Sequence, residues 1–143
     1  MISIILSALV LVAVTVAVHA TGLAVLLRGW DRWHAVTPTR FWPTTALVIR
    51  VTWWLILIHL VEISVWGLFY FWKGFLPDAE SAFYFAGVTY TTIGYGDLVL
   101  QEPWRMLGPI EGLTGILMCG LSAGIFFAVV SRIFLSRSVV ERK

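Results

Sequence analysis

The chain has 143 residues, of which 13% are charged and 59% are hydrophobic, and its formal net charge is +2. Soluble domains carry about a quarter of their residues as charged side chains, so this composition excludes an ordinary soluble protein. The length fits one domain, and the apolar residues fall into runs long enough to cross about 30 Å of hydrocarbon as helices.

The first apolar run covers residues 2–27 and contains no charged side chain. It is about twice as long as the apolar part of a secretory signal peptide, so we interpret residues 1–27 as an N-terminal transmembrane helix. It lacks the regularly spaced arginines of a voltage sensor. Residues 28–45 form a basic connector with three tryptophans, a composition typical of chain that lies along the lipid headgroups.

A second span is predicted over residues 46–72, because tryptophan and tyrosine side chains gather near both of its ends, as they do at the two interfaces of a bilayer. The last apolar run, residues 104–135, predicts a third span, and its glycines at GxxxG spacing favour close helix packing. Residues 136–143 form a short basic tail, and we expect no soluble gating domain in this chain.

The segment between these two spans contains an apolar stretch, residues 81–90. A stretch of about ten residues is too short to cross a bilayer, so we predict a re-entrant helix over residues 79–91. Asp78 is placed to cap its N-terminus, and Glu80 suits the positive end of the helix dipole. The sequence TTIGYGD, residues 91–97, follows directly.

Polar, glycine-containing backbone at membrane depth is tolerated only where it is buried in protein or lines an aqueous path. Gly94 and Gly96 alternate with residues that carry side chains, and glycine adopts φ values that other residues avoid. The alternation allows successive carbonyls to point the same way, and a ring of carbonyls repeated by symmetry replaces the hydration shell of a cation. Neutral oxygen ligands suit a monovalent ion better than a divalent one, which prefers carboxylates.

The stretch TIGYG, residues 92–96, resembles the selectivity filter of potassium channels, with isoleucine where the family's filter has valine. Residues 81–91 resemble the pore helix of that family, and the flanking runs resemble its outer and inner helices. The resemblance implies an all-α membrane protein with three transmembrane helices, a re-entrant pore helix and a filter loop per subunit, assembled as a homotetramer around a central pore. The pore domain is residues 46–135, and the first helix is an addition to the family's minimal pore.

The resemblance also implies which residues bind ions and which support the filter. The backbone carbonyls of residues 92–95 and the Thr92 hydroxyl are expected to bind K⁺, and no other cofactor is implied. Asp97 would sit above the filter, three aromatic side chains would form a cuff around it, and Val88 occupies a position where some family members have a carboxylate. The filter residues are Thr92, Ile93, Gly94, Tyr95 and Gly96, the cuff is Tyr84, Phe85 and Tyr95, and the supporting set is Thr91, Asp97, Tyr84, Phe85 and Val88.

Ionisable residues inside the predicted spans are functional candidates, because such groups are costly in a membrane. Glu62 and Glu111 are two of these, and His59 lies one helical turn before Glu62. We hypothesise that His59, Glu62 and Glu111 form a buried polar cluster that supports the pore module and responds to pH. The alternative is a structural network without a sensing role, and His19 either joins it or faces an interface.

The glycines of the last span admit two interpretations. Gly115 and Gly120 are candidate hinges of a gate, because the resemblance places them on the inner helix. Small residues in membrane helices also serve close packing, and the sequence leaves both interpretations open.

The orientation follows from the positive charges. With residues 73–103 outside, eight lysines and arginines lie on the inner side and two on the outer side, which predicts an external N-terminus and a cytoplasmic C-terminus. Four carboxylates near the outer mouth would raise the local cation concentration. The inner set is Arg28, Arg32, Arg40, Arg50, Arg132, Arg137, Arg142 and Lys143, and the outer set is Lys73 and Arg105.

We therefore predict a passive, potassium-selective channel of the prokaryotic type in the plasma or inner membrane. Its partners would be the lipid bilayer, K⁺ and its own copies, with no role for nucleic acid; the sequence specifies no soluble regulator. A weakly selective cation channel and a non-conducting accessory subunit remain as alternatives. A membrane enzyme that uses His19, His59 and Glu62 as metal ligands or acid–base groups is a further alternative, although it leaves TTIGYGD unexplained.

Overall fold

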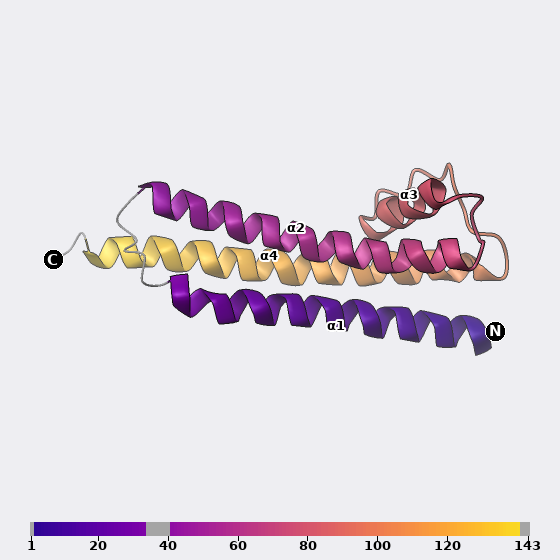
Figure 1. Ribbon diagram of the computed structural model, residues 1–143, viewed down its shortest axis with the longest axis horizontal. Helices are drawn as coiled ribbons and strands as arrows, with labels where there is room; N and C mark the ends of the chain where they lie inside the picture. The colour runs from indigo at the N-terminus through magenta and orange to yellow at the C-terminus, as the bar shows by residue number, and fades with distance from the viewer. Residues whose placement is uncertain (1, 34–40, 141–143) are drawn as a thin grey trace.

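The computed structural model describes residues 2–33 and 41–140, and within these residues the regular structure is helical, with no strand. Three long helices, α1 (Ile2–Trp33), α2 (Phe41–Trp72) and α4 (Leu107–Val140), lie side by side (Figure 1). The short helix α3 (Ala79–Tyr90) and the 3-10 turn η1 (Trp104–Met106) lie in the connection between α2 and α4. The all-α prediction is confirmed for these residues, and the tetramer stays a prediction.

The long helices have the length and composition of membrane spans. Among the described residues, three segments qualify: Ile2–Gly29, Trp42–Trp72 and Trp104–Ile133. The N-terminal end of α1 lies at the end of the bundle that carries α3, and the C-terminal end of α4 lies at the opposite end (Figure 1). This arrangement is that of a multi-pass membrane protein with an odd number of crossings.

Helix α1 is an integral part of the bundle, because it packs along both α2 and α4. One face of α1 is buried and carries two polar side chains, Thr15 and His19, each with no exposed surface. The Trp66 indole donates a hydrogen bond to the Thr15 hydroxyl at 3.0 Å, and the Trp54 indole donates to the carbonyl of Gly22 at 2.9 Å. Two tryptophans of α2 thus hold α1 at two levels.

The helix bounds differ from the predicted ones mainly at the connector. Helix α1 continues to Trp33 and α2 begins at Phe41, so both described ends of the predicted connector are helical. Pro43 does not break the helix, because it lies in the first turn of α2, where its missing N–H is tolerated. Residues 34–40, Arg142 and Lys143 lie outside the described residues, so the charges predicted there stay predictions.

Helices α3 and α4 lie close to their predicted ranges. Helix α3 ends at Tyr90, with Thr91 as its C-cap residue, one residue before the predicted end. The predicted inner helix begins as the 3-10 turn η1 and becomes α-helical at Leu107. Helix α3 packs against α2 and α4, which places the loop that follows it beside both long helices.

Candidate functional site

The N-terminus of α3 is fixed by the predicted cap. Asp78 has an extended backbone and accepts a hydrogen bond from the backbone N–H of Ser81 at 2.8 Å. The Ser81 hydroxyl donates to the other carboxylate oxygen at 3.2 Å, and Glu80 lies in the first turn. An Asp at this position satisfies a free amide of the helix end, so the prediction for Asp78 is confirmed.

Hydrogen bonds fold the filter loop back along the last turn of α3. The backbone N–H of Thr92 donates to the carbonyl of Thr89 at 3.0 Å, and that of Gly94 donates to the carbonyl of Val88 at 3.0 Å. The Thr91 hydroxyl donates to the carbonyl of Gly87 at 2.7 Å. Val88 therefore supports the filter through its backbone oxygen.

Every second residue of the filter loop has a left-handed backbone. The φ angles are +61° at Thr92, +54° at Gly94 and +77° at Gly96. Carbonyls of an extended strand alternate between opposite sides, whereas alternating left- and right-handed residues bring successive carbonyls to one side. Glycine adopts this geometry readily, but at a β-branched residue such as Thr92 it costs about 1–3 kcal/mol. The alternation predicted for the two glycines is present and extends to Thr92.

Tyr84 is the cuff residue that contacts the filter loop. Its hydroxyl donates to Asp97 at 2.7 Å, and the other oxygen of Asp97 accepts the backbone N–H of Leu98 at 3.0 Å. The hydrogen bond to Asp97 is the main cause of a pKa of Tyr84 that is raised above the usual 10.0. The phenol therefore remains a donor, and Asp97 is held at the end of the filter as predicted.

The other two cuff residues are placed differently. Phe85 is 6% exposed and packs edge-on against Tyr70, with 5.3 Å between ring centroids. In the single chain Phe85 belongs to the core between α2 and α3, because an apolar ring without a donor gains more from burial than from contact with the polar loop. The Tyr95 side chain is 70% exposed, and the cuff role of both residues stays a prediction.

The glycines of α4 form the surface on which the end of α3 rests. A Cβ on Gly115 would lie 2.0 Å from the carbonyl oxygen of Tyr90, and one on Gly112 would lie 3.4 Å from the carbonyl oxygen of Thr89. A Cβ on Gly120 would meet no atom within 4 Å. Close packing against α3 thus accounts for Gly115, and the hinge role of both candidates stays a prediction.

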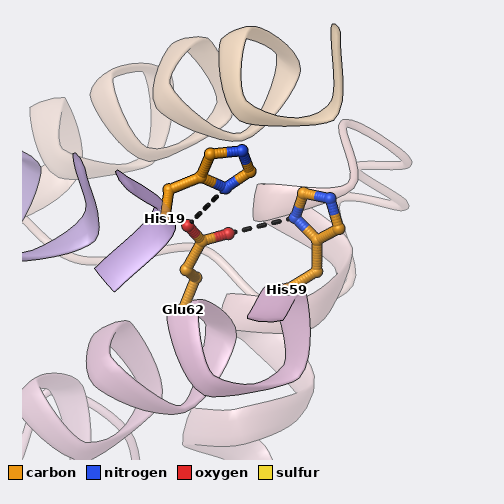
Figure 2. Close-up of side chains that lie close together, drawn as sticks. All are labelled: His19, His59 and Glu62. Atoms are coloured by element: carbon orange, nitrogen blue, oxygen red, sulfur yellow. Dashed lines mark hydrogen bonds and ion pairs between the residues drawn. The ribbon is translucent and has the colours of Figure 1, made fainter. Parts of the chain in front are cut away.

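A buried polar cluster joins α1, α2, α3 and α4 around Glu62. His19 of α1 and His59 of α2 converge on the two carboxylate oxygens (Figure 2), with His19 Nδ1 2.9 Å from Oε1 and His59 Nδ1 3.0 Å from Oε2. The Tyr90 phenol of α3 donates to Oε2, and His59 Nε2 lies 3.1 Å from the Ser122 hydroxyl of α4. Glu62 and His19 have no exposed surface. The cluster predicted around His59 and Glu62 is present, and His19 belongs to it.

Glu111 does not belong to this cluster, which corrects the hypothesis that placed it there. It is fully buried and accepts a hydrogen bond at 2.7 Å from the Tyr70 hydroxyl. Tyr70 lies eight residues after Glu62 on α2, a separation of about 12 Å along a helix. Glu111 therefore forms a second polar pair at a different level of the bundle.

Sequence reasoning missed three hydroxyl groups that complete these contacts: Tyr70, Tyr90 and Ser122. The need for such donors could be predicted, because each carboxylate inside a span needs hydrogen-bond donors, and tyrosine or serine on a facing helix can supply them. The sequence could not show which hydroxyl bonds which carboxylate, since several hydroxyls lie within the same spans.

A comparison with protein families agrees with this arrangement. A family model described as ion channel matches residues 56–132, which is 77 of the 143 residues and covers about half of α2, all of α3, the filter loop and most of α4. Searches of curated proteins and of solved structures found no match. The chain belongs to the ion channel family, of the two-transmembrane potassium-channel type.

Proposed function

We propose that the chain is one subunit of a homotetrameric, potassium-selective channel in the cell membrane. The observation that carries this proposal is the alternation of left-handed residues at Thr92, Gly94 and Gly96. It supports an arrangement in which the carbonyls of residues 92–95, with the Thr92 hydroxyl, replace the hydration shell of K⁺. Family membership makes the chain an ion channel, and the filter backbone is what favours K⁺ among the ions.

The exposure of the filter loop supports a tetramer. All of residues 91–97 are exposed in the single chain, including Ile93 at 55% and Tyr95 at 70%. Polar, irregular backbone at membrane depth must face protein or an aqueous path. Four copies around an axis would give each loop both, because neighbouring subunits would cover the side chains and the carbonyls would line the pore.

The charge distribution supports an external filter. Arg28 lies near the C-terminal end of α1, Arg50 in the N-terminal part of α2 and Arg132 in the C-terminal part of α4. These helix ends lie at the end of the bundle remote from α3 (Figure 1). Positive charge favours the cytoplasmic side, so α3, the filter and the N-terminus would face outward. K⁺ would then leave the cell by passing the filter last.

The test is potassium flux into liposomes that contain the purified protein. Wild-type protein should show flux driven by a K⁺ gradient, blocked by barium and larger than Na⁺ flux under the same gradient. Gly94→Ala should abolish it. A Cβ there would meet no atom within 4 Å but would be forced to φ +54°, so the variant tests backbone conformation rather than space. Gly108→Ala is the matched control, because its Cβ would make only ordinary contacts at 3.9 and 4.0 Å.

Two results would contradict the proposal in distinct ways. Equal Na⁺ and K⁺ flux would show a weakly selective cation channel. No flux from protein that migrates as an intact tetramer would show a non-conducting accessory subunit.

A further inference from the structure

The polar cluster around Glu62 has the composition and spacing of a metal site. His19, His59 and Glu62 each offer one ligand atom, and these atoms lie within 4.8 Å of one another. The three side chains point toward one another from α1 and α2 (Figure 2). The two nitrogen–oxygen pairs are separated by 2.9 and 3.0 Å, and ligands of a tetrahedral zinc ion lie about 3.4 Å apart when the metal–ligand bonds are about 2.1 Å.

The charge of the cluster favours a cation. With both histidines neutral, each Nδ1–H and the Tyr90 phenol donate to Glu62, so every contact of the carboxylate is satisfied. The Glu62 carboxylate and the His19 ring have no exposed surface. Among the described residues no lysine or arginine pairs with Glu62. An uncompensated charge within a span is expensive, and a bound cation would compensate it.

The ligand types select the class of cation. Two imidazole nitrogens and one carboxylate oxygen are ligands of Zn²⁺ and related divalent transition metals. Mg²⁺ and Ca²⁺ prefer sites made of oxygen ligands. This ligand set therefore discriminates against Mg²⁺ and Ca²⁺.

The groups next to the ligands fit the same assignment. Metal-bound histidines usually donate their second nitrogen to a neighbouring group, and His59 Nε2 faces the Ser122 hydroxyl at 3.1 Å. A hydroxyl accepts as well as donates, so the proton of His59 can move to this side and free Nδ1. The second nitrogen of His19 is buried without a partner, so His19 lacks the outer hydrogen bond that His59 has.

A candidate fourth ligand lies beside these three residues. The Tyr90 oxygen bonds Glu62 and lies 3.0 Å from His59 Nδ1, beside the place of a fourth ligand. The His59 side chain is 19% exposed in the single chain.

We propose that His19, His59 and Glu62 bind one divalent transition-metal ion of the Zn²⁺ class, which ties α1 to the pore-forming helices. The family model begins at residue 56, so this site uses a ligand from the helix that the family's match does not include. The bound ion stabilises the contact between α1 and α2.

The test measures zinc binding without measuring ion flux, so its result is independent of the proposed channel activity. Full-length protein is purified with a tag that contains no histidine, in a Cys119→Ser background that removes the exposed thiol. Elemental analysis after dialysis against ZnCl₂ should give one zinc per chain, and ZnCl₂ but not MgCl₂ should raise the unfolding temperature. X-ray absorption of the loaded protein should show nitrogen and oxygen ligands at about 2.0–2.2 Å.

Asparagine variants separate ligation from structure. His19→Asn and His59→Asn keep an amide N–H near the Nδ1 position, so they preserve donation to Glu62 and remove the metal ligand. Each should bind zinc about a hundredfold more weakly or worse, while His34→Ala should bind like the parent. Absence of zinc from the parent protein, or equal zinc in both asparagine variants, would overturn the proposal. If one variant does not fold, the other variant and the X-ray absorption spectrum decide the outcome.

Discussion

Replacing Gly115 by alanine tests how the inner helix supports the filter. The new Cβ would lie 2.0 Å from the carbonyl oxygen of Tyr90 and 2.9 Å from its carbonyl carbon, whereas ordinary contact begins at 3.4 Å. The end of α3 must therefore move away from α4 by about 1.4 Å to restore ordinary contact. Both atoms belong rigidly to backbone, so no side-chain rotation relieves the clash.

The expected loss of stability is large. Overpacking of a well-packed site costs about 1–3 kcal/mol, and we expect the upper end because the displaced atoms are backbone. A loss of about 3 kcal/mol lowers the folding equilibrium constant roughly 150-fold. Tyr90 precedes Thr92 by two residues and its phenol bonds Glu62, so the same displacement should move the filter loop and reduce K⁺ flux.

The assay combines unfolding in detergent with flux in liposomes, and Gly108→Ala is the control on the same face of α4. Its Cβ would meet Phe85 and Thr89 at 3.9 and 4.0 Å, so it should unfold like the wild type. The packing argument is wrong if Gly115→Ala unfolds at the same temperature as Gly108→Ala and changes only the probability that the channel is open. Gly115 would then be a hinge.

The remaining predictions concern two tyrosines. Tyr84→Phe removes the bond to Asp97 and should lower the ratio of K⁺ to Na⁺ flux while the unfolding temperature stays the same; an unchanged ratio would show that the bond does not hold the filter. Because Asp97 raises the pKa of Tyr84 above 10.0, this bond is fully present below that pH and is lost only as the pH rises through the raised pKa. A Tyr84-dependent fall in the flux ratio between neutral pH and about pH 9 would contradict this. Tyr70→Phe leaves both oxygens of buried Glu111 without a partner and should destabilise the protein by about 1–3 kcal/mol, measured against Tyr84→Phe, the same substitution at an exposed site.

The parts of the fold that local chemistry determines could be predicted from the sequence. Helix lengths follow from the width of a bilayer, and the Asp78 cap follows from the needs of a helix end. The left-handed residues at Gly94 and Gly96 follow from the absence of a Cβ. Thr92 could not be assigned a left-handed backbone, because nothing in a threonine favours it and the hydrogen bonds to α3 impose it.

The packing of α1 could not be predicted, for a physical reason. In a soluble helix the apolar stripe marks the buried face, but a membrane helix is apolar on its lipid-facing side as well, so apolar residues alone do not mark the buried face. What remains is the position of the few polar or small residues. Thr15, His19 and Gly22 recur at i, i+4 and i+7, which places them on one face, and all three contact α2.

The additional helix and the buried carboxylate depend on each other. Glu62 is fully buried in the single chain, and His19 of α1 supplies one of its three donors. Without α1, one oxygen of Glu62 would lose its partner, and an unpaired charge within a span is costly. With α1 in place, the carboxylate is free to hold Tyr90, the last residue of α3 before the filter loop. Helix α1 therefore affects the filter indirectly. His19 of α1 supports the Glu62 carboxylate, and that carboxylate holds Tyr90 at the end of α3.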